Sequence, residues 1–150
     1  MPRKITLKFS DFDKTIHATL VEDVPQVADA LWDVIEKPLK LYTWHTTSTG
    51  DYFIGKGRGP VEPARVGSQA KPIGETLFLC RLKPGSICYG GAEELSFAYG
   101  TNITEPLPDK GPVTAMVDEG SLKDFYDAGV HLWNYQTRKH QPVTVTVSRA

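Results

Sequence analysis

Apolar and polar residues alternate along the first 21 positions of the chain, which is the pattern of β-strands with one buried face. Two successive strands carry apolar residues on that face: Ile5, Leu7, Phe9, Ile16, Ala18 and Leu20. The connection between the strands, residues 10–14, is short and polar. We therefore expect the two strands to form a hairpin.

The apolar spacing then changes to that of an α-helix. One stripe falls at helical spacing: Val24, Val27, Ala28, Leu31, Trp32 and Ile35. Asp23 is suited to cap this helix, and Pro25 is tolerated in the first turn because its missing N–H would have no intrahelical partner. A second helix is expected over residues 121–135, where Ser121 and Asp124 resemble a capping box.

The other apolar segments are short and are separated by turn-forming residues. They predict strands at residues 39–46, 52–55, 75–82, 86–89, 94–99, 113–117 and 142–148. Glycine and proline are frequent over 55–72, which predicts a long connection inside one domain. This many short strands with only two helices predict a mainly β fold: a closed eight-stranded antiparallel barrel whose open ends are capped by the helices.

Composition narrows the class of protein without naming a function. The 150 residues predict one domain over 1–150, and 17 Lys and Arg against 18 Asp and Glu give a net charge of −1. This balance argues against nucleic acid or an anionic membrane as the partner, because both attract a basic surface. Two cysteines outside any Cys/His cluster predict no disulfide framework and no metal site, and we expect no cofactor. The absence of a signal peptide and of a membrane-spanning run predicts a cytoplasmic protein.

Candidate site residues are polar side chains that share a strand face with apolar ones, because burying them requires a partner or a purpose. In residues 39–46, His45 is in phase with the two leucines that precede it. Glu93, Arg81 and Tyr89 likewise share the apolar faces of their predicted strands, and all lie near a strand end. These positions predict a polar cluster beside an apolar cavity at the mouth of the barrel. Such groups suit acid–base catalysis or the recognition of a small carboxylate or amide.

Each candidate also has a structural interpretation, since a one-residue error in register swaps every face. Arg81 fits a surface residue of its strand, His45 a hydrogen-bonded structural histidine, and Glu93 a turn residue. Arg58 lies in a glycine-rich segment without phosphate-loop spacing, so it fits a loop residue as well as an anion ligand. The acids of residues 105–109 are interpreted as solvated loop charges.

Several motifs together resemble a known family. The opening hairpin and its helix are followed by residues 84–91, Pro-Gly-Ser-Ile-Cys-Tyr-Gly-Gly, and by a strand that ends in Tyr99-Gly100. With residues 42–45, Tyr-Thr-Trp-His, and the closing helix and strand over 121–148, the pattern resembles small cyclophilin-like proteins of bacteria and archaea. Ser86 stands where the family usually has an acid. The resemblance implies an eight-stranded barrel capped by two helices. It does not imply classical prolyl isomerase activity, because the Phe-His-Arg and Gln-x-Gly-Asp segments of true cyclophilins are absent.

We therefore expect a small-molecule site at one barrel mouth, with acid–base chemistry on a carboxylate or cyclic-amide compound. The expected roles are distributed as follows: His45 as the acid or base, Glu93 as its partner or a second base, Arg81 or Arg58 as the anion ligand, and Trp44, Tyr89 and Tyr99 as the wall. Isomerase and lyase chemistry fit this site, and a weaker resemblance to opine-type condensing enzymes adds carbon–nitrogen condensation. Two alternatives stay open: a prolyl isomerase-like or peptide-binding module, and a non-catalytic oligomeric accessory subunit such as a homodimer.

Overall fold

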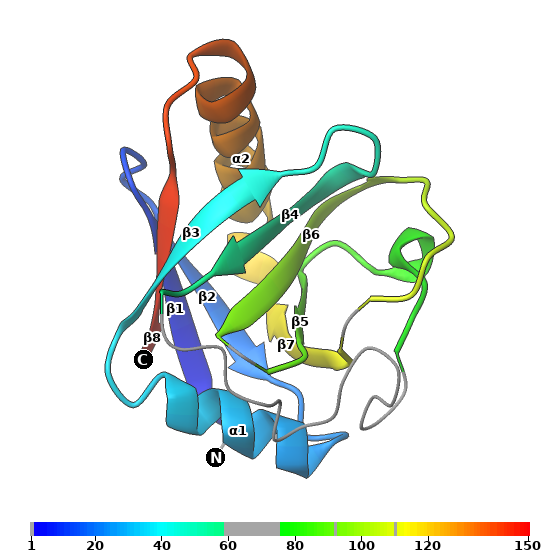
Figure 1. Cartoon of the computed structure of the whole chain (residues 1–150). Coiled ribbons are helices and arrows are strands. Elements are labelled where there is room, and N and C mark those ends of the chain that lie inside the picture. Colours follow the sequence, from blue (N-terminus) through cyan, green and yellow to red (C-terminus); the bar gives the residue numbers. More distant parts are fainter. Residues whose placement is uncertain (1, 59–75, 92, 110) are drawn as a thin grey trace.

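Eight antiparallel strands close into a barrel in the computed structural model of the chain, which describes residues 2–58, 76–91, 93–109 and 111–150 (Figure 1). The strands are β1 Lys4–Phe9, β2 Thr15–Leu20, β3 Leu39–His45, β4 Gly50–Lys56, β5 Ser86–Tyr89, β6 Glu94–Ile103, β7 Val113–Val117 and β8 Thr144–Arg149. Their order around the barrel is β1-β2-β7-β5-β6-β4-β3-β8. The predicted mainly β fold with eight strands is confirmed. Most of the predicted 55–72 connection lies outside the described residues.

The predicted alternation of faces holds along the strands that carry the site. In β3, Leu41 and Thr43 are buried while Lys40 and Trp44 are exposed, so odd-numbered residues point into the barrel. Odd-numbered residues of β1, β6 and β8 also point inward and join one core: Ile5, Leu7, Phe9, Leu95, Phe97, Tyr99, Val145 and Val147. The phase of a side chain in the sequence therefore indicates directly whether it lies inside the barrel.

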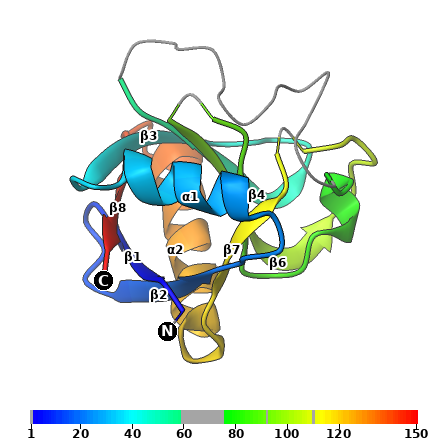
Figure 2. The same ribbon diagram turned by 90° about the horizontal axis from the view of Figure 1, so that it is seen from below.

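Two helices cover the ends of the barrel, as predicted. Helix α1, Pro25–Val34, crosses one opening, and helix α2, Leu122–Trp133, lies at the opposite end and continues into a π-helical turn, Asn134–Arg138 (Figures 1 and 2). Neither predicted cap forms as expected. Val24 is at the N-cap of α1 instead of Asp23, and the Ser121 hydroxyl accepts a hydrogen bond from the His17 N–H at 3.1 Å. Over the described residues, no helix has both the length and the hydropathy needed to cross a membrane.

The predicted strand over residues 75–82 is wrong. Leu79–Arg81 forms a 3₁₀ turn, which places Leu79 and Leu82 on one side, three residues apart. Both leucines pack on the outer surface of the barrel in a second apolar cluster with Tyr52 and Ala98. The apolar residues of this segment therefore cover the barrel from outside and do not extend its sheet.

Asp109 is the main correction to the prediction of solvated loop acids. Its side chain is only 4% exposed and lies on the outer surface of the barrel. Its carboxylate accepts hydrogen bonds from the Tyr52 hydroxyl at 3.0 Å and the Ser96 hydroxyl at 2.8 Å. Burial raises the pKa of Tyr52, and the nearby Asp109 charge raises it further. This network attaches the segment after β6 to strands β4 and β6.

Candidate functional site

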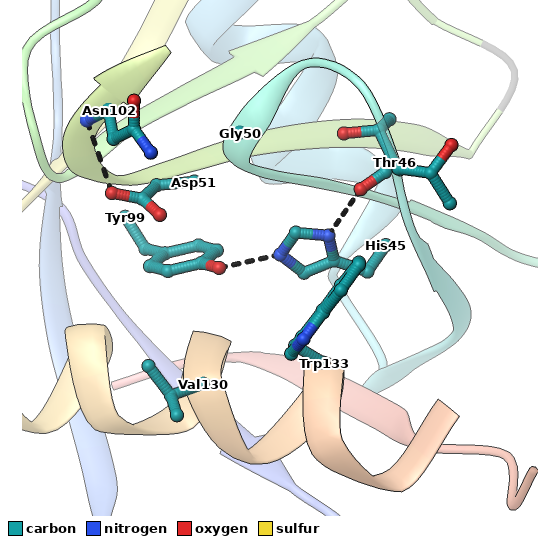
Figure 3. A pocket seen from close by; sticks show the side chains of 9 residues that line it. His45, Thr46, Gly50, Asp51, Tyr99, Asn102, Val130 and Trp133 are labelled. Atoms are coloured by element: carbon teal, nitrogen blue, oxygen red, sulfur yellow. Dashed lines mark hydrogen bonds between the residues drawn. The ribbon is translucent and has the colours of Figure 1, made fainter. Parts of the chain in front are cut away.

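A cavity of about 280 Å³ lies at the α2 end of the barrel (Figure 3). Its walls come from β3, β4, β6 and α2, and from the turn between β3 and β4: His45, Thr46, Thr47, Gly50, Asp51, Tyr99, Asn102, Val130 and Trp133. The cavity can hold a small organic molecule, and the polar groups of its wall determine what it can do chemically.

His45 and Tyr99 form a hydrogen-bonded pair inside this cavity (Figure 3). His45 Nδ1 lies 2.6 Å from the carbonyl oxygen of Thr46. Because a carbonyl only accepts, Nδ1 carries the proton, and in the neutral ring Nε2 must then be the acceptor. The Tyr99 hydroxyl lies 2.5 Å from Nε2 and donates to it. The contacts thus select one tautomer of His45.

Both groups of the pair are held in their uncharged forms. Burial lowers the pKa of His45 below its usual value, although the Thr46 carbonyl and the Asp51 charge act in the opposite direction. Burial also raises the pKa of Tyr99, and the charge of Asp51 raises it further. At neutral pH the pair is therefore a neutral imidazole that accepts a hydrogen bond from a protonated phenol. This arrangement can take up a proton and return it.

Asp51 brings a carboxylate to the same cavity through an irregularity in β4. The register between β4 and β6 shifts between Gly50 and Tyr52, and Gly50 has a φ of +110° that favours glycine. The Asp51 carboxylate accepts a hydrogen bond from the Asn102 N–H at 3.1 Å. It lies against Gly100, where any side chain would collide with it. Gly100 thus makes room for this carboxylate, and Gly50 permits the backbone conformation that precedes it.

Of the predicted site residues, the structure brings together His45 and Tyr99. Trp44 neighbours His45 in sequence but points out of the barrel and is 43% exposed. Tyr89 is buried in the barrel core on β5 and does not line the cavity.

Glu93, Arg58 and Arg81 lie elsewhere. Glu93 belongs to the turn before β6, with a φ of +54°, and its carbonyl accepts a hydrogen bond from the Gly57 N–H. Six residues of extended chain, about 20 Å, separate it from Tyr99. Arg58 stacks on Tyr42, with 4.5 Å between its Cζ and the ring centroid. Arg81 is exposed on the outer 3₁₀ turn. The predicted pairing of Glu93 with His45 does not occur in this geometry.

Seven of the nine described lining residues were not among the predicted site residues, including Asp51, Asn102 and Trp133. Asp51 lies just before the strand predicted over residues 52–55, although it is in phase with the inward Phe53 and would have been found by extending that strand. Asn102 lies beyond the predicted end of β6, which continues to Ile103. Trp133 has the spacing of a helix core residue, and its indole lies 4.8 Å from the His45 ring. Of these residues, only Asp51 could have been found from the sequence, by its phase with Phe53.

The burial of neutral His45 predicts a pH dependence of folding. The pKa of His45 is lowered in the folded state, so the unfolded chain binds the proton more readily. Stability associated with His45 is therefore fully present above the unfolded pKa, about 6.5, and is lost as the pH falls through the folded pKa. We expect urea denaturation at pH 7.5 and pH 5.5 to show a smaller loss of stability in His45→Gln than in the wild type. An equal loss in both proteins would contradict the assignment.

Among the described residues, no group of three or more His, Cys, Asp and Glu side chains is arranged to hold a metal ion. The chain matches no protein-family model and no curated protein. Among solved structures it is similar to McbB, determined in complex with tryptophan. The TM-score is 0.80 and the identity 23%, over 97% of this chain and 44% of McbB, so the chain spans less than half the length of McbB. At this identity the similarity shows a shared barrel fold.

Proposed function

We propose that the cavity at the α2 end binds a small organic amine and that the Tyr99–His45 pair moves a proton to and from it. The observation that carries this proposal is the hydrogen bond from the Tyr99 hydroxyl to the unprotonated Nε2 of His45 inside a cavity. A half-buried neutral histidine that touches a cavity through a phenol is suited to acid–base catalysis.

The proton transfer follows from the direction of the hydrogen bonds. The Tyr99 oxygen accepts an acidic hydrogen of the ligand while its own hydrogen passes to Nε2 of His45. The ligand keeps the electron pair of the broken bond, and the imidazole becomes an imidazolium. The Thr46 carbonyl and Asp51 both favour this charged ring. The reverse transfer protonates the product and restores the pair, so no oxidant or reductant is needed.

The charge of the wall supports an amine as the ligand. Asp51 is the only group that is charged at neutral pH among the described lining residues, because His45 is neutral there. A protonated amine would be attracted to this carboxylate, and an aromatic body would pack on Trp133 and Tyr99. McbB was determined with tryptophan, which has an amine and an aromatic ring as well as a carboxylate. A ligand with only a carboxylate would meet Asp51 without a described lysine or arginine in the wall.

We also propose a relationship with the cyclophilin-like proteins that the sequence resembles. The residue pattern over 84–100 and the barrel with two helices support a relationship with cyclophilin-like proteins. The single domain over 1–150, the cytoplasmic location and the homodimer stay predictions from the sequence. The peptide-binding and accessory-subunit alternatives stay predictions from the sequence.

Asp51→Asn tests the ligand class. Tryptamine, which has an amine and no carboxylate, is expected to bind the wild type and to bind Asp51→Asn about tenfold more weakly, because a charge-assisted contact is lost. Indole-3-propionate, which has the reverse charge, is expected to bind Asp51→Asn better than the wild type. The measurement is a titration followed by NMR shifts at the Trp133 indole.

Asp127→Asn is the matched control, because Asp127 is partly exposed on α2, pairs with Lys123 and does not line the cavity. It should leave both affinities unchanged. Equal tryptamine binding by the wild type and Asp51→Asn, or no binding at the cavity residues by either probe, would overturn the proposed ligand class.

A further inference from the structure

A π-helical turn follows α2 and has no role in the proposed proton transfer. Residues Asn134–Arg138 form this turn, and the Gln141 N–H closes it by donating to the Tyr135 carbonyl at 2.8 Å. π-helical turns are rare and often lie at functional sites. This one lies beside the end of β3 that carries His45.

Strand β3 loses its neighbour β8 just before His45. The two strands pair as far as Tyr42 with Thr144, and the Thr43 N–H then donates to the Val143 carbonyl at 3.2 Å. The same register would place Gln141 opposite His45. Gln141 instead turns back to Tyr135, so the β8 side of β3 lacks a backbone partner at His45.

The side chain of Gln136 occupies that position. Its Oε1 accepts a hydrogen bond from the His45 N–H at 2.8 Å. Its Nε2 donates to the Thr43 carbonyl at 2.7 Å and to the Thr43 hydroxyl oxygen at 3.1 Å. One side-chain amide thus bonds the backbone of both Thr43 and His45 on the side where β8 has ended.

We propose that Gln136 is a positioning residue that substitutes for the missing strand and holds His45 in the tautomer and orientation that bind Tyr99. Both ring contacts depend on the backbone at this point. Nδ1 bonds to the carbonyl of the next residue, Thr46, and Nε2 must reach the Tyr99 hydroxyl on another strand. At His45 the strand keeps β4 as its neighbour on one side only, so a backbone shift toward the open β8 side would break both contacts. The inference rests on the proposed function only for the reaction that the pair performs.

The test uses Gln136→Leu, with Gln141→Leu as the matched control because the Gln141 side chain is exposed in the same segment. In the ligand-free protein, ¹⁵N NMR reports which ring nitrogen of His45 carries the proton. Gln136→Leu is expected to change a single tautomer into a mixture and to accelerate hydrogen exchange of the His45 amide about tenfold. It should also move the pKa of His45. The other ionisable residues at the ring, Asp51 and Tyr99, are not substituted in this variant, so such a change follows from the loss of the Gln136 amide. Gln141→Leu should leave all three readouts as in the wild type.

The tautomer and the exchange rate separate positioning from a loss of stability. A folded Gln136→Leu protein that keeps the wild-type tautomer would overturn the inference. If this variant does not fold, Gln136→Asn replaces it, because the asparagine amide is one methylene too short to make all of these bonds. A wild-type tautomer in Gln136→Asn would likewise overturn the inference. These readouts need no ligand. Altered tautomers with no tryptamine binding would therefore support the role of Gln136 and contradict the proposed function.

Discussion

Tyr99→Phe is expected to lower the turnover of the bound amine by about 10²–10⁴ while leaving the fold intact. The phenyl ring would still fill its buried position against Phe53 and Tyr126, so packing changes little. The hydroxyl, however, is the only atom of Tyr99 that touches Nε2 of His45. Without it the ligand loses the oxygen that would accept its proton. Turnover is measured by NMR of the substrate at saturating concentration, with folding checked by near-UV circular dichroism.

A readout without ligand supports the same variant. The Tyr99 hydroxyl donates to the neutral form of the His45 ring and thereby favours it. Removing the hydroxyl should raise the pKa of His45 toward its usual value, measured by NMR titration of the ring. Tyr126→Phe is the matched control, because Tyr126 is 45% exposed and does not line the cavity. Equal losses of turnover in the two variants, or an unchanged His45 pKa in Tyr99→Phe, would contradict the role of the pair.

His45 and Tyr99 were predictable because the faces of barrel strands alternate strictly. In β3 and β6 both residues are in phase with apolar neighbours, and both point into the barrel as expected. The pattern of apolar residues also predicted the eight strands and two helices, together with one strand over residues 75–82 that does not form. These features depend on local periodicity, which a single sequence contains.

Which mouth of the barrel a residue occupies depends on strand order, which periodicity does not contain. β3 and β6 both run antiparallel to β4, so they run in the same direction. His45 ends β3 and Glu93 precedes β6, so the two lie at opposite mouths. The prediction noted that each polar residue was near a strand end, but not which end. With the order β6-β4-β3 known, Glu93 would have been excluded and Asp51 included.

Gln136 was beyond prediction for a different reason. Its role depends on a single turn of π-helix and on the point where β8 leaves β3. Both follow from the tertiary fit of the chain after α2, since a helix pattern does not distinguish its last α turn from a π turn. Arg81 was misplaced by a similar ambiguity, because apolar residues at 77, 79 and 82 fit a strand about as well as the 3₁₀ turn that forms.

Gly129→Ala is expected to destabilise the protein by up to about 2 kcal/mol, against the preference of a helix for alanine. Helix propensity alone would favour alanine by about 1 kcal/mol at this interior position of α2. The added Cβ, however, would overlap the ring of Tyr99, which is 5% exposed and packed in the barrel core. Either α2 or the ring must move, and overpacking of this kind costs about 1–3 kcal/mol. Urea denaturation at pH 7.5 measures the change.

Gly120→Ala is the matched control, because a Cβ at Gly120 would have no atom within 4 Å. It should change stability by no more than about 0.5 kcal/mol. The displacement of Tyr99 in Gly129→Ala should also lengthen its contact with His45. The ¹⁵N spectrum should then show a mixture of His45 tautomers, and the turnover should fall. A stabilised Gly129→Ala protein with a normal tautomer would show that α2 does not press on Tyr99. The bare α-carbon of Gly129 would then have no part in placing the Tyr99 hydroxyl next to His45.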